Sequence, residues 1–249
     1  MMDVEAHILR QALLPFTTCF ASSSTVTLRL EGTRLVVSKA SCSMSHALRI
    51  SAALARPPLD TCAVALRVPI GKLATALAAF DDAAVLQLSA SATILRIQCE
   101  DFCVDLLGRE YDRDCRCDDA DMAKLFTGEL QTIHVDVVKL SRFAALADGL
   151  RLQDAVLAVT TSDFTIRCKR NADGTENEQA SLTMPRSSGL ASELASGLVS
   201  GQLVVSTSLL ADLISAAARM APNATIGLAT WGLRITWGDL AEAALMTTR

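Results

Sequence analysis

Four cysteines near the middle of the chain have the residue type of a metal site. They read Cys99-x3-Cys103-x11-Cys115-x-Cys117, and thiolates are preferred ligands of structural zinc. The spacing matches no common zinc motif, however, and Cys99 and Cys103 fall within apolar strand patterns. The N-terminal stretch does not resemble a secretory signal, so the eight cysteines are expected to be reduced thiols. We therefore expect buried or unused thiols in preference to zinc, and no other cofactor.

Residues that could carry out catalysis do not form a recognisable set. The chain has three histidines, His7, His46 and His134, and none has a Cys or Ser nearby in a nucleophile motif. No glycine-rich phosphate loop occurs. The acid pairs Asp81-Asp82 and Asp118-Asp119 fall in predicted turns, where solvated carboxylates are common. We predict that the protein is not an enzyme, unless a pocket holds an acid, base or thiol of strongly shifted pKa.

Cationic side chains recur on the predicted helices and could bind phosphate. Each lies away from the apolar face of its helix: Arg10, Lys72, Lys139, Arg142 and Arg219. Taken singly, each is an ordinary solvated surface residue. Taken together they stand out, because the chain as a whole has a formal net charge of −4. If the helices share one side of the molecule, that side would attract the phosphates of a duplex without reading its sequence.

The elements that position these cations follow an internal repeat. Three segments, starting at Val64, Leu130 and Gly201, each begin with a short alternating strand. Each continues into a helical pattern of about eleven residues, a polar turn and further alternating strands. The N-terminus reads as a fourth copy, with a helix from about Glu5 to Leu14 that Pro15 ends. The repeat therefore predicts four strand-helix-strand units.

Composition and the repeat together predict the fold class. Hydrophobic residues make up 51% of the chain and aromatic residues 4%, which fits a globular protein and disfavours single-strand binders that stack bases on aromatic rings. No apolar run is long enough to cross a membrane. We predict an α+β fold of two similar domains, residues 1–108 and 130–249, each with two helices packed on antiparallel sheets. Residues 109–129 form a polar connector.

This order of elements, with a connector between the halves, resembles the DNA sliding clamps of the proliferating cell nuclear antigen family over essentially the whole chain. The closest correspondence is the stretch QLVVSTSLLADLISAAARMAPNATIGLATWGLRITWG with the closing strand ALMTTR, which is similar to the family's final strand, helix and hairpin. Within the family, Cys19-Phe20-Ala21 resembles the early strands of the Rad-one subunit of the heterotrimeric nine-one-one checkpoint clamp. The connector sequence DRDCRCDDAD is less apolar than that of replicative clamps.

The resemblance implies a ring of three chains around double-stranded DNA, in which helices line the hole and sheets form the outer wall. Arg10, Lys72, Lys139, Arg142 and Arg219 would then face DNA phosphates. The edge strands Phe102–Leu107 and Ala180–Met184 would join neighbouring chains, since ring closure satisfies unpaired edges. The interface residues expected from these strands are Phe102, Val104, Leu106, Leu182 and Met184. Leu125 and Phe126 of the connector would border the pocket for partner peptides.

The function implied is that of a nuclear checkpoint clamp subunit, a platform for repair and signalling proteins. Its partners would be two different clamp chains, a clamp loader, and repair or polymerase peptides. Two alternatives remain open: a homotrimeric clamp that makes a replicative polymerase processive, and a clamp-fold scaffold that does not encircle DNA.

Overall fold

The computed structural model describes most of the chain. The residues described are 2–31, 33–41, 46–55, 65–91, 93–100, 102–110, 131–159, 163–172, 175–185, 202–220, 223–229, 231–237 and 241–247. The chain forms two compact units. The first comprises Met1–Ser41, Ala47–Asp118 and Asp239–Ala241, and the second comprises Cys42–His46, Asp119–Gly238 and Glu242–Arg249.

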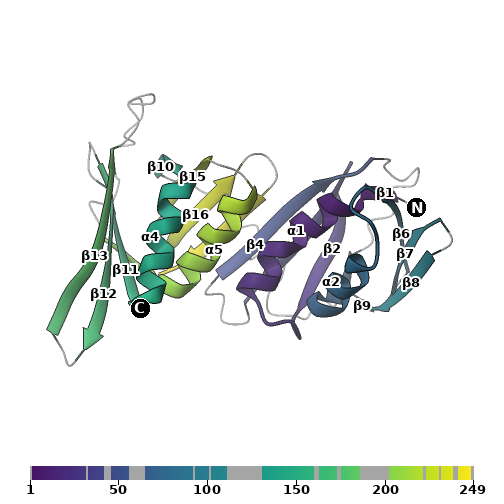
Figure 1. Ribbon diagram of the computed structural model, residues 1–249, viewed down its shortest axis with the longest axis horizontal. Coiled ribbons are helices and arrows are strands. Elements are labelled where there is room, and N and C mark those ends of the chain that lie inside the picture. The colour runs from purple at the N-terminus through teal and green to yellow at the C-terminus, as the bar shows by residue number, and fades with distance from the viewer. Residues whose placement is uncertain are drawn as a thin grey trace. The chain divides into compact units, whose positions relative to one another are not determined.

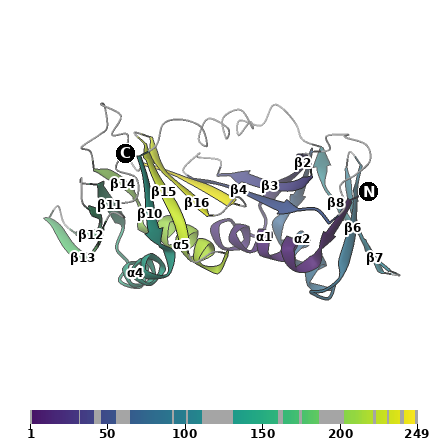
Figure 2. The same cartoon turned by 90° about the horizontal axis from the view of Figure 1, so that it is seen from above.

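The first unit packs two helices on antiparallel sheets. Its elements are β1 (Met2–Glu5), α1 (Ala6–Cys19), β2 (Thr25–Glu31), β3 (Arg34–Ala40), β4 (His46–Ala53), β5 (Ala65–Pro69), α2 (Ile70–Ala78), β6 (Val85–Ala90), β7 (Ile94–Cys99), β8 (Phe102–Leu107) and β9 (Arg109–Glu110). One sheet has the order β1-β6-β7-β8, and the other strands are ordered β4-β3-β2-β5-β9. Helices α1 and α2 lie side by side (Figures 1 and 2).

The second unit has the same construction. Its elements are β10 (Gln131–Asp136), α4 (Val137–Gly149), β11 (Asp154–Val159), β12 (Asp163–Ala172), β13 (Thr175–Pro185), β14 (Leu203–Ser206), α5 (Thr207–Met220), β15 (Asn223–Ala229), β16 (Gly232–Trp237) and β17 (Ala241–Met246). The strand orders are β10-β15-β16-β17 and β13-β12-β11-β14. Helix α4 packs against α5 (Figure 1).

The pairing of the strands repeats from one unit to the other. Strand β1 pairs with β6 as β10 pairs with β15, and β2 pairs with β5 as β11 pairs with β14. Each unit therefore contains two copies of a strand, a helix and further antiparallel strands. The predicted α+β class, with two helices on antiparallel sheets in each half, is confirmed.

Alternation of apolar and polar residues accounts for these elements. In β5, Leu66 and Val68 are buried while their neighbours are not, as expected of a strand with one face on the core. The next residues change to helical spacing, and Ile70, Leu73 and Leu77 on one face of α2 are fully buried. Burying an aliphatic side chain of this size contributes about 1.5–3 kcal/mol, so both segments are fixed by the same core.

Helix α1 extends further than its sequence predicts. The predicted end at Leu14 is wrong, because the helix spans Ala6–Cys19 with Pro15 inside it. A proline in a helix interior removes one hydrogen bond and costs about 3 kcal/mol. Burial of Phe16 in the following turn offsets part of this cost, and the Thr17 hydroxyl donates to the Leu14 carbonyl oxygen at 2.8 Å.

The tripeptide Cys19-Phe20-Ala21 does not lie in a strand. Cys19 is the last residue of α1 and Phe20 is its C-cap, while Ala21 lies in the turn before β2. The expectation that these residues belong to an early strand is therefore wrong, because burial of Phe16 and Cys19 extends the helix through this point.

Gly108 allows the chain to pass from β8 in one sheet to β9 in the other. A Cβ atom at this position would lie 2.7 Å from the Arg67 carbonyl oxygen and 2.9 Å from a methyl carbon of Leu66. Contacts this short do not occur between real side chains and backbone, so only glycine fits without a shift of β5. The close contact of Gly108 with the backbone of β5 therefore fixes the point at which the chain leaves β8.

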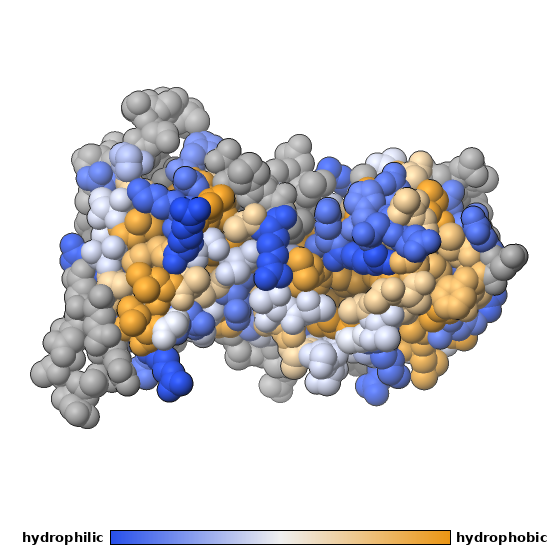
Figure 3. Space-filling model, viewed as in Figure 1, coloured by the Kyte–Doolittle hydropathy of each residue, from blue (hydrophilic) through white to orange (hydrophobic). Residues whose placement is uncertain are grey.

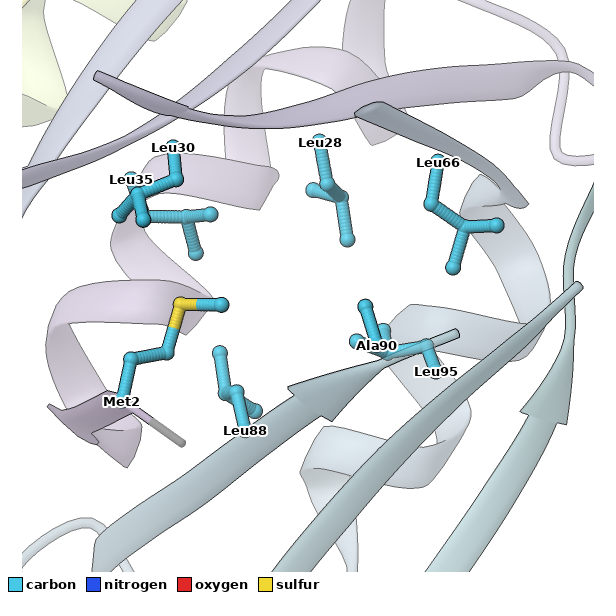
Figure 4. Close-up of a pocket in the computed structure, with 8 residues that line it drawn as sticks. All are labelled: Met2, Leu28, Leu30, Leu35, Leu66, Leu88, Ala90 and Leu95. Carbon is cyan, nitrogen blue, oxygen red and sulfur yellow. The ribbon is translucent and has the colours of Figure 1, made fainter. Parts of the chain in front are cut away.

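A small apolar cavity lies between the sheets of the first unit. Its volume is about 20 Å³, room for about one water molecule. The side chains that line it are all apolar and point toward one another (Figure 4): Met2, Leu28, Leu30, Leu35, Leu66, Leu88, Ala90 and Leu95. A cavity of this size and lining is a packing defect and offers no polar group to a ligand.

None of the described helices has the length and apolar character needed to cross a membrane.

Candidate DNA-facing and subunit-facing surfaces

The cysteines are not gathered into a metal site in the described part of the chain. Cys99 pairs with Phe102 and Cys103 pairs with Gln98 across β7 and β8, so the two thiols point to opposite faces of the sheet. Cys115 and Cys117 lie outside the described residues. Among the residues described, no group of three or more His, Cys, Asp or Glu side chains could hold a metal ion.

The candidate catalytic residues occupy separate places. His7 lies 3.3 Å from the Glu5 carboxylate at the start of α1, and the Nδ1 atom of His134 lies 3.2 Å from the Thr225 hydroxyl on β15. His46 is buried at the start of β4. These contacts are of the kind that fix a surface or core side chain and do not assemble an acid, a base and a nucleophile.

The buried thiol of Cys168 is the strongest case of a shifted pKa among the cysteines described. Burial raises the pKa of this thiol, and the nearby Thr207 hydroxyl offsets part of the rise. Both residues are 1% exposed. A thiol that is buried and protonated is a poor nucleophile, so Cys168 is a core residue.

The predicted DNA-facing cations of the first unit differ from each other. The Lys72 side chain is exposed on the first turn of α2, and no ion pair or hydrogen bond joins it to another described residue. Arg10, in contrast, is only partly exposed, at 29% of its side chain. Its guanidinium bonds the carbonyl oxygens of Leu77 and Phe80 and the carboxylate of Asp82. Arg10 thus joins α1 to the end of α2.

The predicted cations of the second unit are exposed on its helix pair. Lys139 and Arg142 lie on α4, and Arg219 lies in the last turn of α5. Within the described residues, their side chains make no ion pair. A cation in the last turn of a helix also interacts favourably with the helix dipole, which gives Arg219 a structural role alongside any contact with phosphate.

Two acids lie on the same helix pair and interact with each other. The pKa of Asp212 on α5 is raised, first by partial burial and then by the negative charge of Asp148 on α4. Two carboxylates on adjacent helices lower the net positive charge that the helix pair presents to an anion.

Apolar side chains also lie on the outward face of α4. Val138, Leu146 and Leu150 are 42%, 56% and 45% exposed. With Arg142 they recur at every fourth position, which places them on one stripe of the helix. In the view of Figure 3, hydrophobic side chains lie among hydrophilic ones over each unit taken by itself. Part of α4 is therefore suited to contact with another apolar surface.

Both predicted joining strands are edge strands of their sheets. Strand β8 ends the order β1-β6-β7-β8, and β13 ends the order β13-β12-β11-β14. An edge strand has one row of unpaired backbone N–H and C=O groups that can pair with another chain.

The side chains predicted to form the subunit interface divide into two kinds. Phe102 is 50% exposed, and Val104 and Leu182 are partly exposed. Leu106 and Met184 are 9% and 6% exposed. All five side chains lie on the core-facing side of their strands. Burial on that side is most complete at Leu106 and Met184, which therefore belong to the cores of their own units.

Sequence reasoning missed the exposed apolar residues on the outer face beside β8. Leu107 is 69% exposed and pairs across the strands with Ile94, which is 39% exposed. On the same face, the Arg96 guanidinium bonds both carboxylate oxygens of Asp105 at 2.7 Å. This hydrogen bonding holds the pKa of Asp105 below its usual value. The alternation of β8 could have indicated Leu107, had both faces of the edge strand been considered.

The predicted partner-peptide residues Leu125 and Phe126 lie outside the described residues, as does the connector from residue 111 onward.

Comparison with known proteins identifies the fold. No protein-family model and no curated protein sequence matches the chain. Among solved structures, it is similar to PCNA of A. fulgidus, solved with the C-terminal region of FEN-1 bound, with a TM-score of 0.70, 11% identity and coverage of 100% of this chain and 99% of that chain. It is also similar to a chain of the PCNA2–PCNA3 complex from Sulfolobus tokodaii, with a TM-score of 0.69, 7% identity and coverage of 99% and 98%. The chain therefore has the fold of PCNA-type sliding clamps along its whole length.

Proposed function

We propose that this protein is a subunit of a ring-shaped sliding clamp that encircles double-stranded DNA. The single observation that carries the proposal is the structural similarity to PCNA chains, which covers at least 99% of this chain and at least 98% of each PCNA chain. Such a subunit acts as a platform for other proteins and is not an enzyme. The separate placement of the histidines and the apolar lining of the small cavity are in keeping with this role.

Neighbouring subunits would join through β8 of one chain and β13 of the next. Each is an edge strand with free backbone groups, and Phe102 and Leu182 retain exposed surface on them. The exposed Leu146 of α4 and Leu150 at its C-cap fit burial at the same joint, because exposed apolar side chains lose their exposed area when a neighbour covers them.

DNA would be held by charge, without base contacts. Lys72 in the first unit and Lys139, Arg142 and Arg219 in the second are free to approach phosphates, and Arg10 would contribute through its remaining exposed surface. Each phosphate neutralised makes the affinity more sensitive to salt, with a slope of about −0.9 per contact in a log–log plot. So few cations, with Asp148 and Asp212 on the helix pair of the second unit, fit loose and mobile contact.

For the type of clamp, we favour a nuclear checkpoint clamp made of three different chains. The supporting observations are the small number of free helix cations and the polar connector sequence DRDCRCDDAD. Such a ring requires a clamp loader and binds repair or signalling partners, with Leu125 and Phe126 near the site of their peptides. The alternatives are a homotrimeric clamp for a replicative polymerase and a clamp-fold scaffold that does not encircle DNA.

The mass of the purified protein in solution tests the composition of the ring. A stable trimer would support the homotrimeric clamp and would contradict the three-chain ring. A monomer that assembles only with two other chains would support the checkpoint clamp.

Charge reversal tests the contact with DNA. The double variant Lys72→Glu with Arg142→Glu should shorten retention of the ring on a closed circular duplex, more strongly at low salt, because both side chains are exposed. The circular dichroism spectrum and melting temperature should stay near those of the unchanged protein. Unchanged retention at low salt would contradict the assignment of these cations.

A further inference from the structure

The Arg10 guanidinium forms hydrogen bonds with one short segment of the chain. Its Nε and Nη2 atoms donate to the Leu77 carbonyl oxygen at 3.0 and 2.7 Å. Nη2 also donates to the Phe80 carbonyl oxygen, and Nη1 to the Asp82 carboxylate. The acceptors lie 67 to 72 residues away in sequence, so these bonds are tertiary contacts that link α1 to the end of α2.

The end of α2 is held partly by its own backbone. The helix has nine residues and no basic residue in its last turn, and its last carbonyl oxygens accept backbone N–H groups from the residues just after it, as Leu77 does from Phe80 at 3.2 Å. A guanidinium at these carbonyls supplies both donors and a positive charge at the negative end of the helix dipole. Arg10 provides what α2 lacks in its own sequence.

The contact is reciprocal. Helix α1 has no side-chain N-cap, and its first N–H groups are bonded by the turn that follows α2. The Ala6 N–H donates to the Ala84 carbonyl oxygen at 2.9 Å, and the His7 N–H donates to the Asp82 carbonyl oxygen at 3.3 Å. The start of α1 and the end of α2 therefore cap each other, and Arg10 is the side-chain part of this arrangement.

The capped turn supports the edge strand. Phe80, whose carbonyl oxygen accepts from Arg10, is 7% exposed. Its ring packs edge-on against Phe102, with centroids 5.2 Å apart and planes at 68°. Phe102 is the first residue of β8 and is 50% exposed. The backbone position of Phe80 thus determines where the ring of Phe102 rests.

We infer that Arg10 is a positioning residue for the β8 edge, and that it acts there through Phe80 and Phe102. The inference rests on the proposed function, in which β8 is one side of the subunit joint. Loss of the guanidinium frees the last turn of α2, removes the fixed support under Phe102, and loosens the end of β8 that must pair with a neighbour.

Hydrogen exchange of the β8 amides, measured in full-length protein, tests this inference. In Arg10→Met, protection of β8 should fall about 10-fold or more, in line with the loss of charge-assisted hydrogen bonds. Protection of β12 and β13 in the second unit should stay unchanged. Lys72→Met is the matched control, because it removes the same charge from an exposed side chain in the same helix pair, and it should leave β8 unchanged.

A second variant covers the case in which Arg10→Met does not fold. Arg10→Lys keeps the charge but cannot reach all three acceptors at once, so β8 should lose protection by a smaller factor in a folded protein. Unchanged β8 protection in both variants would overturn the inference. A loss spread equally over β8, β12 and β13 would also overturn it, since that pattern indicates general destabilisation.

Subunit association, followed by sedimentation of the protein with its ring partners, separates this inference from the proposed function. Arg10→Met should weaken association and Lys72→Met should not. If Phe102→Ser leaves association unchanged, β8 is not the joint and the proposed function fails. If Phe102→Ser weakens association and Arg10→Met does not, only the role of Arg10 fails.

Discussion

The two helix pairs are built on the same strand order, but their ends are capped in different ways. In the second unit these positions are filled from the helices' own sequences: Asp136 accepts from the N–H of Lys139 at the start of α4, and Arg219 lies in the last turn of α5. In the first unit the caps come from the other helix or its turn. Arg10 of α1 serves α2, and the turn after α2 serves α1.

This difference in capping accounts for the contrast between the bonded Arg10 and the exposed cations of α4. Counting from the first helical residue, Arg10 is the fifth residue of α1, and Ser141 is the fifth of α4. The second unit therefore keeps Lys139 and Arg142 exposed, while the first unit uses a cation for a tertiary contact. In equivalent helices of a repeat, a cation can thus either form a tertiary contact or stay exposed.

The largest effect on stability should come from removing Arg10 from the end of α2 and supplying a cation from α2 itself. Arg10→Ser should lower the free energy of unfolding of the first unit by about 1.5–3 kcal/mol, because several hydrogen bonds to a charged group are lost. Adding Ala78→Arg places a cation in the exposed last turn of α2, as in α5, and should restore about 0.3–1 kcal/mol. Denaturant titrations of both variants measure this. No recovery in the double variant would break the comparison with α5.

The next largest effect should be the difference in stability lost when the N-cap residues of α4 and α1 are replaced. Asp136→Ala should cost about 1 kcal/mol, because the side chain accepts from the Lys139 N–H at the start of α4. Glu5→Ala, at the corresponding place before α1, should cost only a few tenths, because Glu5 makes no side-chain cap. Chemical denaturation compares the two variants. Equal losses would show that α1 also depends on its own side chain.

A smaller effect concerns pH and is confined to the second unit. The pKa of Asp212 is raised in the folded protein by burial and by Asp148, so folding binds its proton more tightly than the unfolded chain does. The native state is then favoured when Asp212 is protonated, and stability falls as pH rises through its folded pKa. Asp212→Asn should raise the melting temperature at pH 7, and the gain should vanish below about pH 4, near the unfolded pKa. A gain that persists at pH 3 would exclude this cause.

The smallest effect should come from glycines in corresponding helix pairs. A Cβ at Gly149 of α4 would meet nothing within 4 Å, whereas one at Gly71 of α2 would lie 3.0 Å from the Ser22 carbonyl oxygen. Gly149→Ala should stabilise the protein by about 0.4–1 kcal/mol, and Gly71→Ala should not stabilise it. Thermal melts of the two variants, run together, check this. A gain at Gly71 equal to that at Gly149 would mean that the turn at Ser22 yields readily.

The repeat of elements could be predicted because it depends on local patterns. Alternation in segments such as β5 and apolar spacing in α2 are properties of a few neighbouring residues. Edge strands β8 and β13 followed from the same patterns together with the clamp resemblance. Pro15 misled the prediction because the burial of Phe16, a tertiary effect, outweighs a local signal.

The site was less predictable than the fold. Nothing near Arg10 in sequence indicates that its acceptors are the carbonyl oxygens of Leu77 and Phe80, since backbone carbonyls leave no trace in residue types. Leu106 and Met184 were predicted at the interface from their place on edge strands, but how deeply each position of such a strand is buried depends on the packing of the whole unit.

The central claim is that the protein forms part of a ring around duplex DNA. Its most direct test is the residence time of the assembled protein on a covalently closed circular duplex, before and after one cut by a restriction enzyme, at a salt concentration that suppresses simple electrostatic binding. A clamp should remain on the closed circle and slide off the ends once the circle is cut. Equal residence on cut and uncut DNA, or none on either, would contradict the account.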